Sequence, residues 1–163
     1  MMDKLASQQK MQFAHDAANH QDIHCLSRTD RLKHYGLHYG KYCGRLARGS
    51  GSHSYHKTII DWMLVALSAS IALQDNLADV HLATVLVDDD ESAFRRLCDA
   101  SGRFCDGCEK IDHLESFREI VVQANRDLLM LLIGEFARLE LELGSALEER
   151  RAELRIRAFY SES

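Results

Sequence analysis

Apolar residues recur at intervals of three and four along most of the chain, the spacing that places them on one face of an α-helix. Between about residue 27 and Arg48 this apolar stripe consists of Leu32, Tyr35, Tyr39, Tyr42, Cys43 and Leu46. A second segment, from about Tyr55 to Leu73, is apolar on nearly every side, which predicts a buried core helix. Residues 49–52, with the sequence GSGS, form the clearest loop and join the two predicted helices.

The second half of the chain predicts two further long helices. Acidic residues at 88–91 favour a helix N-terminus because they complement the helix dipole, and this helix would run to about His113. The last helix would begin near Glu115 and continue beyond Ala146. Residues 77–87 leave two alternatives open, a short helix or a strand at 84–87. The pattern therefore predicts an all-α fold, an antiparallel bundle of four main helices with a long C-terminal helix.

Composition supports one helical domain. The 163 residues include no proline, so nothing in the chain interrupts long helices in the way that proline does. Hydrophobic residues make up 46% of the sequence, enough for a packed core. We expect residues 1–25 to be a polar N-terminal segment and residues 26–160 to form the helical bundle.

Charge and cysteine content narrow the classes of partner and compartment. A net charge of −5 argues against binding to extended nucleic acid. Residues 59–73 form the longest apolar run, which is too short to span a bilayer, and the polar N-terminus has no signal-like apolar stretch. Five cysteines, an odd number, are consistent with free thiols in a reducing compartment. We therefore expect a cytoplasmic protein without a membrane partner or structural disulfides.

Four basic or imidazole side chains share one face of the first long helix. His34, His38, Lys41 and Arg45 follow each other in steps of four, three and four. Such a face suits a phosphate or carboxylate ligand. The alternative is an ordinary solvated helix face.

Asp61 interrupts the apolar second helix, and Ser68 follows two turns later on the same side. A carboxylate on a core-facing helix is costly unless it binds a metal or pairs with a cation. Two roles therefore stay open for Asp61: metal ligand, or structural partner of a basic residue such as Arg45 or Lys41.

Two clusters on the third predicted long helix suggest metal chemistry. Asp106, Glu109 and Asp112 lie one turn apart and provide the oxygen ligands that Mg²⁺ prefers, although such spacing is also common on acidic surfaces. A second set has cysteine and histidine at spacings that resemble a zinc site: Cys98, Cys105, Cys108 and His113. The same cysteines would also suit a buried helix seam.

Histidines are frequent, with nine in the chain. Five of them suggest a transition-metal site in the bundle: His15, His20, His24, His53 and His56. No phosphate-binding P-loop, nucleophile elbow or dinucleotide fingerprint is present.

Two stretches resemble the first two core helices of MazG-like all-α nucleoside triphosphate pyrophosphohydrolases. They are residues 31–46, RLKHYGLHYGKYCGRL, and residues 59–73, IIDWMLVALSASIAL. The resemblance covers about residues 24–80, and residues 102–113 fit it loosely. The family holds Mg²⁺ with an E-x-x-E pair on one helix and an E-x-x-D pair on the next. Asp61 stands at the family's aspartate, but Thr58 replaces the preceding glutamate. The first pair falls on non-acidic residues, either His38 and Lys41 or Lys41 and Gly44.

The resemblance implies a nucleotide-binding protein that cleaves a nucleoside triphosphate, with Mg²⁺, into the monophosphate and pyrophosphate. Asp61 and Lys41 would be the catalytic candidates, and the metal would be held by Asp61, Asp106, Glu109 and Asp112. The nucleotide phosphates would be bound by His34, His38, Lys41 and Arg45. A catalytically inactive interaction or regulatory protein on the same scaffold, or a histidine-rich metal-binding bundle, are the alternatives. The apolar run of the last helix also predicts a homodimer.

Overall fold

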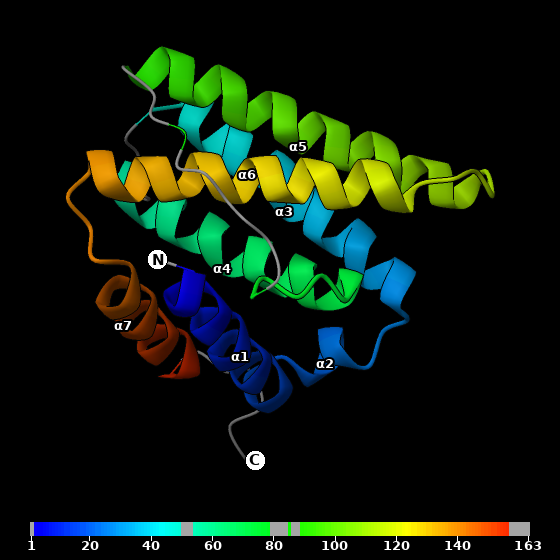
Figure 1. Cartoon of the computed structure of the whole chain (residues 1–163), viewed down its shortest axis with the longest axis horizontal. Coiled ribbons are helices and arrows are strands. Elements are labelled where there is room, and N and C mark those ends of the chain that lie inside the picture. The colour runs from blue at the N-terminus through cyan, green and yellow to red at the C-terminus, as the bar shows by residue number, and fades with distance from the viewer. Residues whose placement is uncertain (1, 50–53, 79–84, 86–88, 157–163) are drawn as a thin grey trace.

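The computed structural model describes residues 2–49, 54–78, 85 and 89–156, and within these residues it contains α-helices and no strand (Figure 1). The helices are α1 (Met2–Asn19), α2 (Gln21–His24), α3 (Arg28–Ala47), α4 (Tyr55–Leu73), α5 (Asp90–Asp112), α6 (Arg118–Arg138) and α7 (Leu143–Ile156). The predicted all-α bundle is confirmed. Residues 50–53, 79–84 and 86–88 lie outside the described residues, and so does most of the segment for which a short helix or a strand was predicted.

Polar residues ahead of the helices determine where three of them begin. The side chains of Ser27, Ser54 and Asp89 each accept a hydrogen bond from a backbone N–H in the first turn of α3, α4 and α5. Such caps satisfy donors that the helix itself leaves unpaired. At the other end of α4, Gln74 adopts a left-handed conformation with φ of 54°, which terminates the helix.

Helix α4 lies in the middle of the bundle, packed against α3 and α6 on one side and against α1 and α7 on the other (Figure 1). Trp62, Met63 and Leu67 are completely buried, as expected for a core helix. Among the described residues, only α4 is long and apolar enough to cross a membrane, but 72% of its apolar window is buried by the other helices. The burial explains why nearly every side of this helix is apolar.

The N-terminal segment is part of the bundle. Within the predicted polar segment, residues 2–19 form α1 and residues 21–24 form α2, and α1 packs on α4 and α7. Gln8, Gln12 and His15 are buried there, and the guanidinium of Arg151 on α7 donates hydrogen bonds to the side-chain oxygens of both glutamines. An interface built from polar side chains has little apolar periodicity, which is why the sequence pattern set this segment apart.

The predicted long C-terminal helix is interrupted between α6 and α7. Glu140 takes a left-handed conformation with φ of 54°, and the N–H of Leu141 bonds to the carbonyl of Phe136, a helix-ending arrangement. The glycine usual at such a turn is missing here, so no residue in the sequence marks the break. The apolar run from Leu128 to Phe136 is mostly buried within the bundle. The other helices of the same chain therefore cover this apolar run. The homodimer stays a prediction, but the apolar run no longer supports it.

Helices α5 and α6 approach closely at Gly107. A Cβ atom added to Gly107 would lie 2.4 Å from Cγ2 of Val121. We expect Gly107→Ala to lower the free energy of unfolding by about 1–3 kcal/mol because the helices must move apart. Gly102→Ala, on the same helix with open space around it, is the control and should be neutral or stabilising. Urea unfolding measures both, and equal stabilities would contradict the close approach.

Candidate functional site

A cavity of about 600 Å³ opens between α1, α2, α3, α4 and α7. Helices α3 and α4 provide most of its wall, α1 and α2 border one part of it, and α7 contributes Arg150 and Leu154. Its lining combines apolar side chains with several charged ones. A mixed lining of this kind and size is typical of small-molecule sites.

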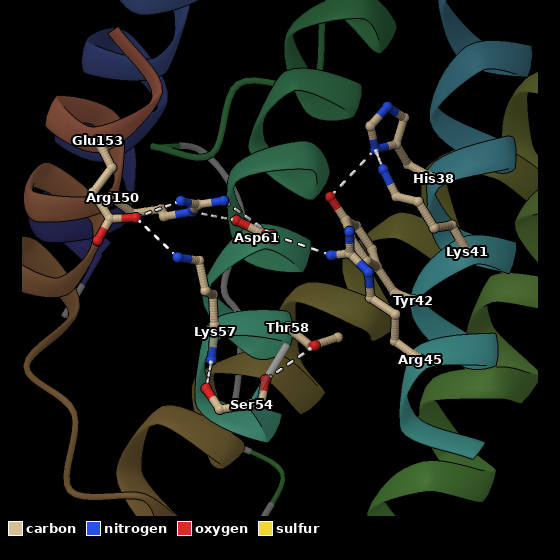
Figure 2. A network of polar contacts seen from close by, with 10 residues as sticks. All are labelled: His38, Lys41, Tyr42, Arg45, Ser54, Lys57, Thr58, Asp61, Arg150 and Glu153. Carbon is tan, nitrogen blue, oxygen red and sulfur yellow. Dashed lines mark hydrogen bonds and ion pairs between the residues drawn. The ribbon is translucent and has the colours of Figure 1, made fainter. Parts of the chain in front are cut away.

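All four residues of the predicted basic stripe line this cavity. His34, His38, Lys41 and Arg45 occupy successive turns of α3 and face α4, as Figure 2 shows for the last three. Three of the four side chains, His34, His38 and Arg45, are partly buried, whereas Lys41 is exposed, so the face is only partly solvated. We call these four side chains the α3 stripe.

A chain of hydrogen bonds links three members of the α3 stripe. Nζ of Lys41 lies 2.9 Å from Nδ1 of His38, and Nε2 of His38 lies 3.1 Å from Nε2 of His34. A charged lysine can only donate, so Nδ1 of His38 accepts and its Nε2–H donates to His34. This arrangement leaves Nδ1 of His34 as the protonated nitrogen of that ring.

Both imidazoles are held in their neutral form. Burial, helped by the positive charge of Lys41, lowers the pKa of His38 to about 3. Burial and Lys41 also lower the pKa of His34. Lys41 itself has a lowered pKa because it is partly desolvated and lies near Arg45. The α3 stripe therefore concentrates positive charge on Lys41 and Arg45, with neutral hydrogen-bonding rings beside them.

Asp61 is paired with two arginines at the edge of the cavity (Figure 2). Nε of Arg150 lies 2.6 Å from its Oδ1, and Nη1 of Arg45 lies 3.3 Å from its Oδ2. Asp61 and Arg150 are both almost fully buried. Of the two roles left open for Asp61, the structure shows the ion pair, and Arg45 was one of its expected partners.

Arg150 extends this network into α7 and was not predicted. Besides Asp61 it contacts Glu153, which also accepts a hydrogen bond from Lys57 on α4 (Figure 2). Arg150 follows Asp61 by 89 residues, and no local pattern connects them. The only indication in the sequence was that a core-facing carboxylate needs a cationic partner.

A second polar cluster, also not predicted, lies on the α1 side of the cavity. Ser68 on α4 donates a hydrogen bond of 2.6 Å to Asp16, and Gln12 donates another of 2.8 Å. Burial raises the pKa of Asp16. Arg31 also lines the cavity, and its buried Nε has no hydrogen-bond partner within the described residues.

The predicted magnesium ligands do not come together. Asp106, Glu109 and Asp112 are exposed on α5, and none of them lines the cavity that contains Asp61. Asp112 instead pairs with Lys33 on α3. In the described part of the chain, no three His, Cys, Asp or Glu side chains are grouped in a way that could hold a metal ion. The reason is that α5 packs chiefly on α3 and α6, away from the α4 face that presents Asp61.

The predicted zinc ligands also do not gather at one point among the described residues, although Cys105 and Cys108 both lie beside Gly36. Cys108 is buried against Gly36 of α3, whereas His113 is largely exposed at the end of α5. Burial and the neighbouring Cys98 thiol raise the pKa of Cys43 to about 12, which is typical of thiols that pack as small apolar groups. All five cysteines are free.

The histidine-rich set does not form a cluster among the described residues. His15 is buried between α1 and α7 with its ring beside that of His20, and His24 packs against Phe13. His56 is exposed at the start of α4, and His53 lies outside the described residues.

Comparisons of the chain with known protein families, with curated proteins and with solved structures found no match. The chemistry of the cavity lining is therefore the main guide to function.

Proposed function

We propose that the cavity binds a phosphorylated small molecule of nucleotide size through the α3 stripe. The observation that supports this most directly is Lys41, which lines the cavity and has no carboxylate partner within the described residues. Its lowered pKa reflects the nearby charge of Arg45 and partial desolvation. An anion placed between the two cations would relieve their repulsion.

The neutral histidines suit the same ligand. A phosphate group presents several acceptor oxygens. N–H donors held in fixed positions can bond several of these oxygens at once, which favours phosphate over smaller anions. Because His38 is locked as an acceptor from Lys41, the ring of His34 keeps a protonated Nδ1 available as a donor. The cavity volume of about 600 Å³ leaves room for a sugar and a base as well as the phosphate.

The MazG resemblance further implies magnesium-dependent cleavage of the nucleotide. The geometry supports binding better than cleavage, because Asp61 is neutralised by Arg45 and Arg150 and the acidic cluster of α5 lies outside the cavity. Binding without a metal is therefore the proposed function. Hydrolysis stays a prediction from the resemblance, and the assay below tests it together with binding.

Replacing Lys41 tests the proposal. We expect Lys41→Gln to weaken binding of nucleoside mono- and triphosphates at least about tenfold, since one charge-assisted phosphate contact is lost. Lys10→Gln, which removes an exposed lysine on α1 outside the cavity, is the control and should bind like the wild type. Titration calorimetry without metal measures affinity.

The same titrations repeated with Mg²⁺ and a pyrophosphate assay separate binding from cleavage. Binding that is unchanged by Mg²⁺, with no pyrophosphate formed, supports a binding protein. Release of pyrophosphate that Asp61→Asn abolishes without a change in melting temperature would instead favour the hydrolase. No binding of any phosphorylated ligand by the wild type would refute both.

A further inference from the structure

Asp16 is a second charged group of the cavity that the proposed function has not used. It lines the cavity, it is partly buried, and within the described residues it forms no ion pair. A partly buried carboxylate without a cation carries a desolvation cost. Ser68 and Gln12 each donate one hydrogen bond to it, but a carboxylate can accept about four. Acceptor capacity is therefore left over in the cavity.

The two charged ends of the cavity are held by the same helix. Asp61 of α4 forms ion pairs with Arg45 and Arg150. Ser68, seven residues further along α4, donates a hydrogen bond to Asp16. Seven residues make two turns of helix, or about 10 Å along its axis. This separation is comparable with the distance from the phosphate of a nucleoside monophosphate to the far edge of its base.

On the α4 side, the wall between these two ends is apolar. Leu64 and Val65, which lie between Asp61 and Ser68 in the sequence, line the cavity there. Apolar and aromatic side chains suit the flat faces of a base or another uncharged ring. The cavity thus combines the positive charge of Lys41 and Arg45, an apolar strip of α4, and a hydrogen-bond acceptor held two helical turns from Asp61.

We propose that Asp16 accepts a hydrogen bond from an amino group of the ligand, so that the cavity selects phosphorylated molecules with an amino group on the ring edge opposite the phosphate. This inference rests on the proposed function. An amino group can donate to the free lone pairs of Asp16, whereas a carbonyl oxygen at the same place would be repelled by them. Among nucleotides, those of cytosine and adenine meet the requirement and those of uracil and hypoxanthine do not.

Two pairs of nucleotides differ at this ring edge, where the amino group and its neighbouring unprotonated ring nitrogen are replaced by a carbonyl and a ring N–H, which makes them the natural probes. Cytidine monophosphate has an amino group where uridine monophosphate has a carbonyl, and adenosine and inosine monophosphates differ in the same way. By titration calorimetry with the full chain, we expect the amino member of each pair to bind about tenfold more tightly, as expected for one hydrogen bond to a charged acceptor.

Substitution of Asp16 should remove this preference. We expect Asp16→Asn to reduce the ratio within each pair to about threefold or less, because an amide side chain can donate to a carbonyl as well as accept from an amine. Asp106→Asn removes an exposed carboxylate outside the cavity and should leave the ratio unchanged. Ser68→Ala, which releases Asp16 from its α4 anchor, should lower the ratio as well. Thermal unfolding checks that each variant is folded.

The affinities of the unmodified protein for the two members of each nucleotide pair test the inference even if a variant does not fold. Equal affinities within each pair, or tighter binding of the carbonyl member, would overturn the role of Asp16 while leaving the phosphate site in place. If no nucleotide binds, the proposed function fails and this inference fails with it. A preference for the amino members that Asp16→Asn leaves intact would assign the selection to another residue and overturn the inference.

Discussion

Asp61→Asn is expected to lower the free energy of unfolding by about 3–5 kcal/mol. The substitution keeps the shape of the side chain but removes the charge that Arg45 and Arg150 share. Arg150 is almost fully buried, so its guanidinium would be left without a full counter-charge in a poorly solvated place. Chemical unfolding monitored by circular dichroism measures the loss.

A matched control separates burial from charge. Asp99→Asn breaks the pair with Arg103 on the exposed face of α5 and should cost less than about 1 kcal/mol, because exposed pairs contribute little. Arg150→Met combined with Asp61→Asn should recover part of the stability, since the double variant no longer buries an arginine that has lost its Asp61 partner. If Asp61→Asn were as mild as Asp99→Asn, the structural role of Asp61 would be wrong.

Stability is expected to fall as the pH is lowered from 6.5 to about 4.5. The pKa of His38 lies at about 3 and that of His15 at about 4, in both cases chiefly because of burial, whereas the pKa of a histidine in the unfolded chain is about 6.5. In this range the unfolded chain binds more protons than the folded one, so acid favours unfolding. Together the two rings should cost about 2–4 kcal/mol, with allowance for the partial exposure of His38.

Unfolding by urea at a series of pH values measures this slope. Asp16 acts in the opposite direction, since its raised pKa favours the folded chain in acid, and it reduces the slope at the low end of the range. His38→Gln should make the curve shallower, whereas His56→Gln, on an exposed ring, should not change it. A stability that stays constant between pH 6.5 and pH 5 would mean that both rings are protonated in the folded state.

A helix could be predicted from the sequence where packing in the core requires apolar residues at regular intervals along it. The boundaries of α3 and α4 agree with the pattern because each buries one apolar face or nearly its whole surface in the core, and Ser27 is a cap with a local signature. The packing of α1 and the break after α6 could not be predicted. The first depends on glutamines that pair with a distant arginine, and the second on a left-handed Glu140 without glycine.

The site residues that share one helix could be predicted from their spacing in the sequence. The contacts between site residues of different helices could not. The α3 stripe is a local pattern, since residues three and four apart share a face. Arg150 and Asp16 join the cavity across 89 and 52 residues of chain, respectively, and leave no local trace. The spacing of the acidic residues of α5 shows that they share one face of the helix. It does not show what that face contacts, and in the structure it is exposed.

The contacts of α7 also bear on how the chain assembles during synthesis. Helices α3 to α6 pack on one another through partners that are all made by residue 138. The bonds from Arg150 to Asp61 and from Arg151 to Gln8 join segments 89 and 143 residues apart, and they can form only after α7 has left the ribosome. Contacts between such distant segments form late, because closing a long loop costs entropy before any contact is gained. The part of the cavity wall that α7 provides, Arg150 and Leu154, is therefore completed after the part built by α1 to α4.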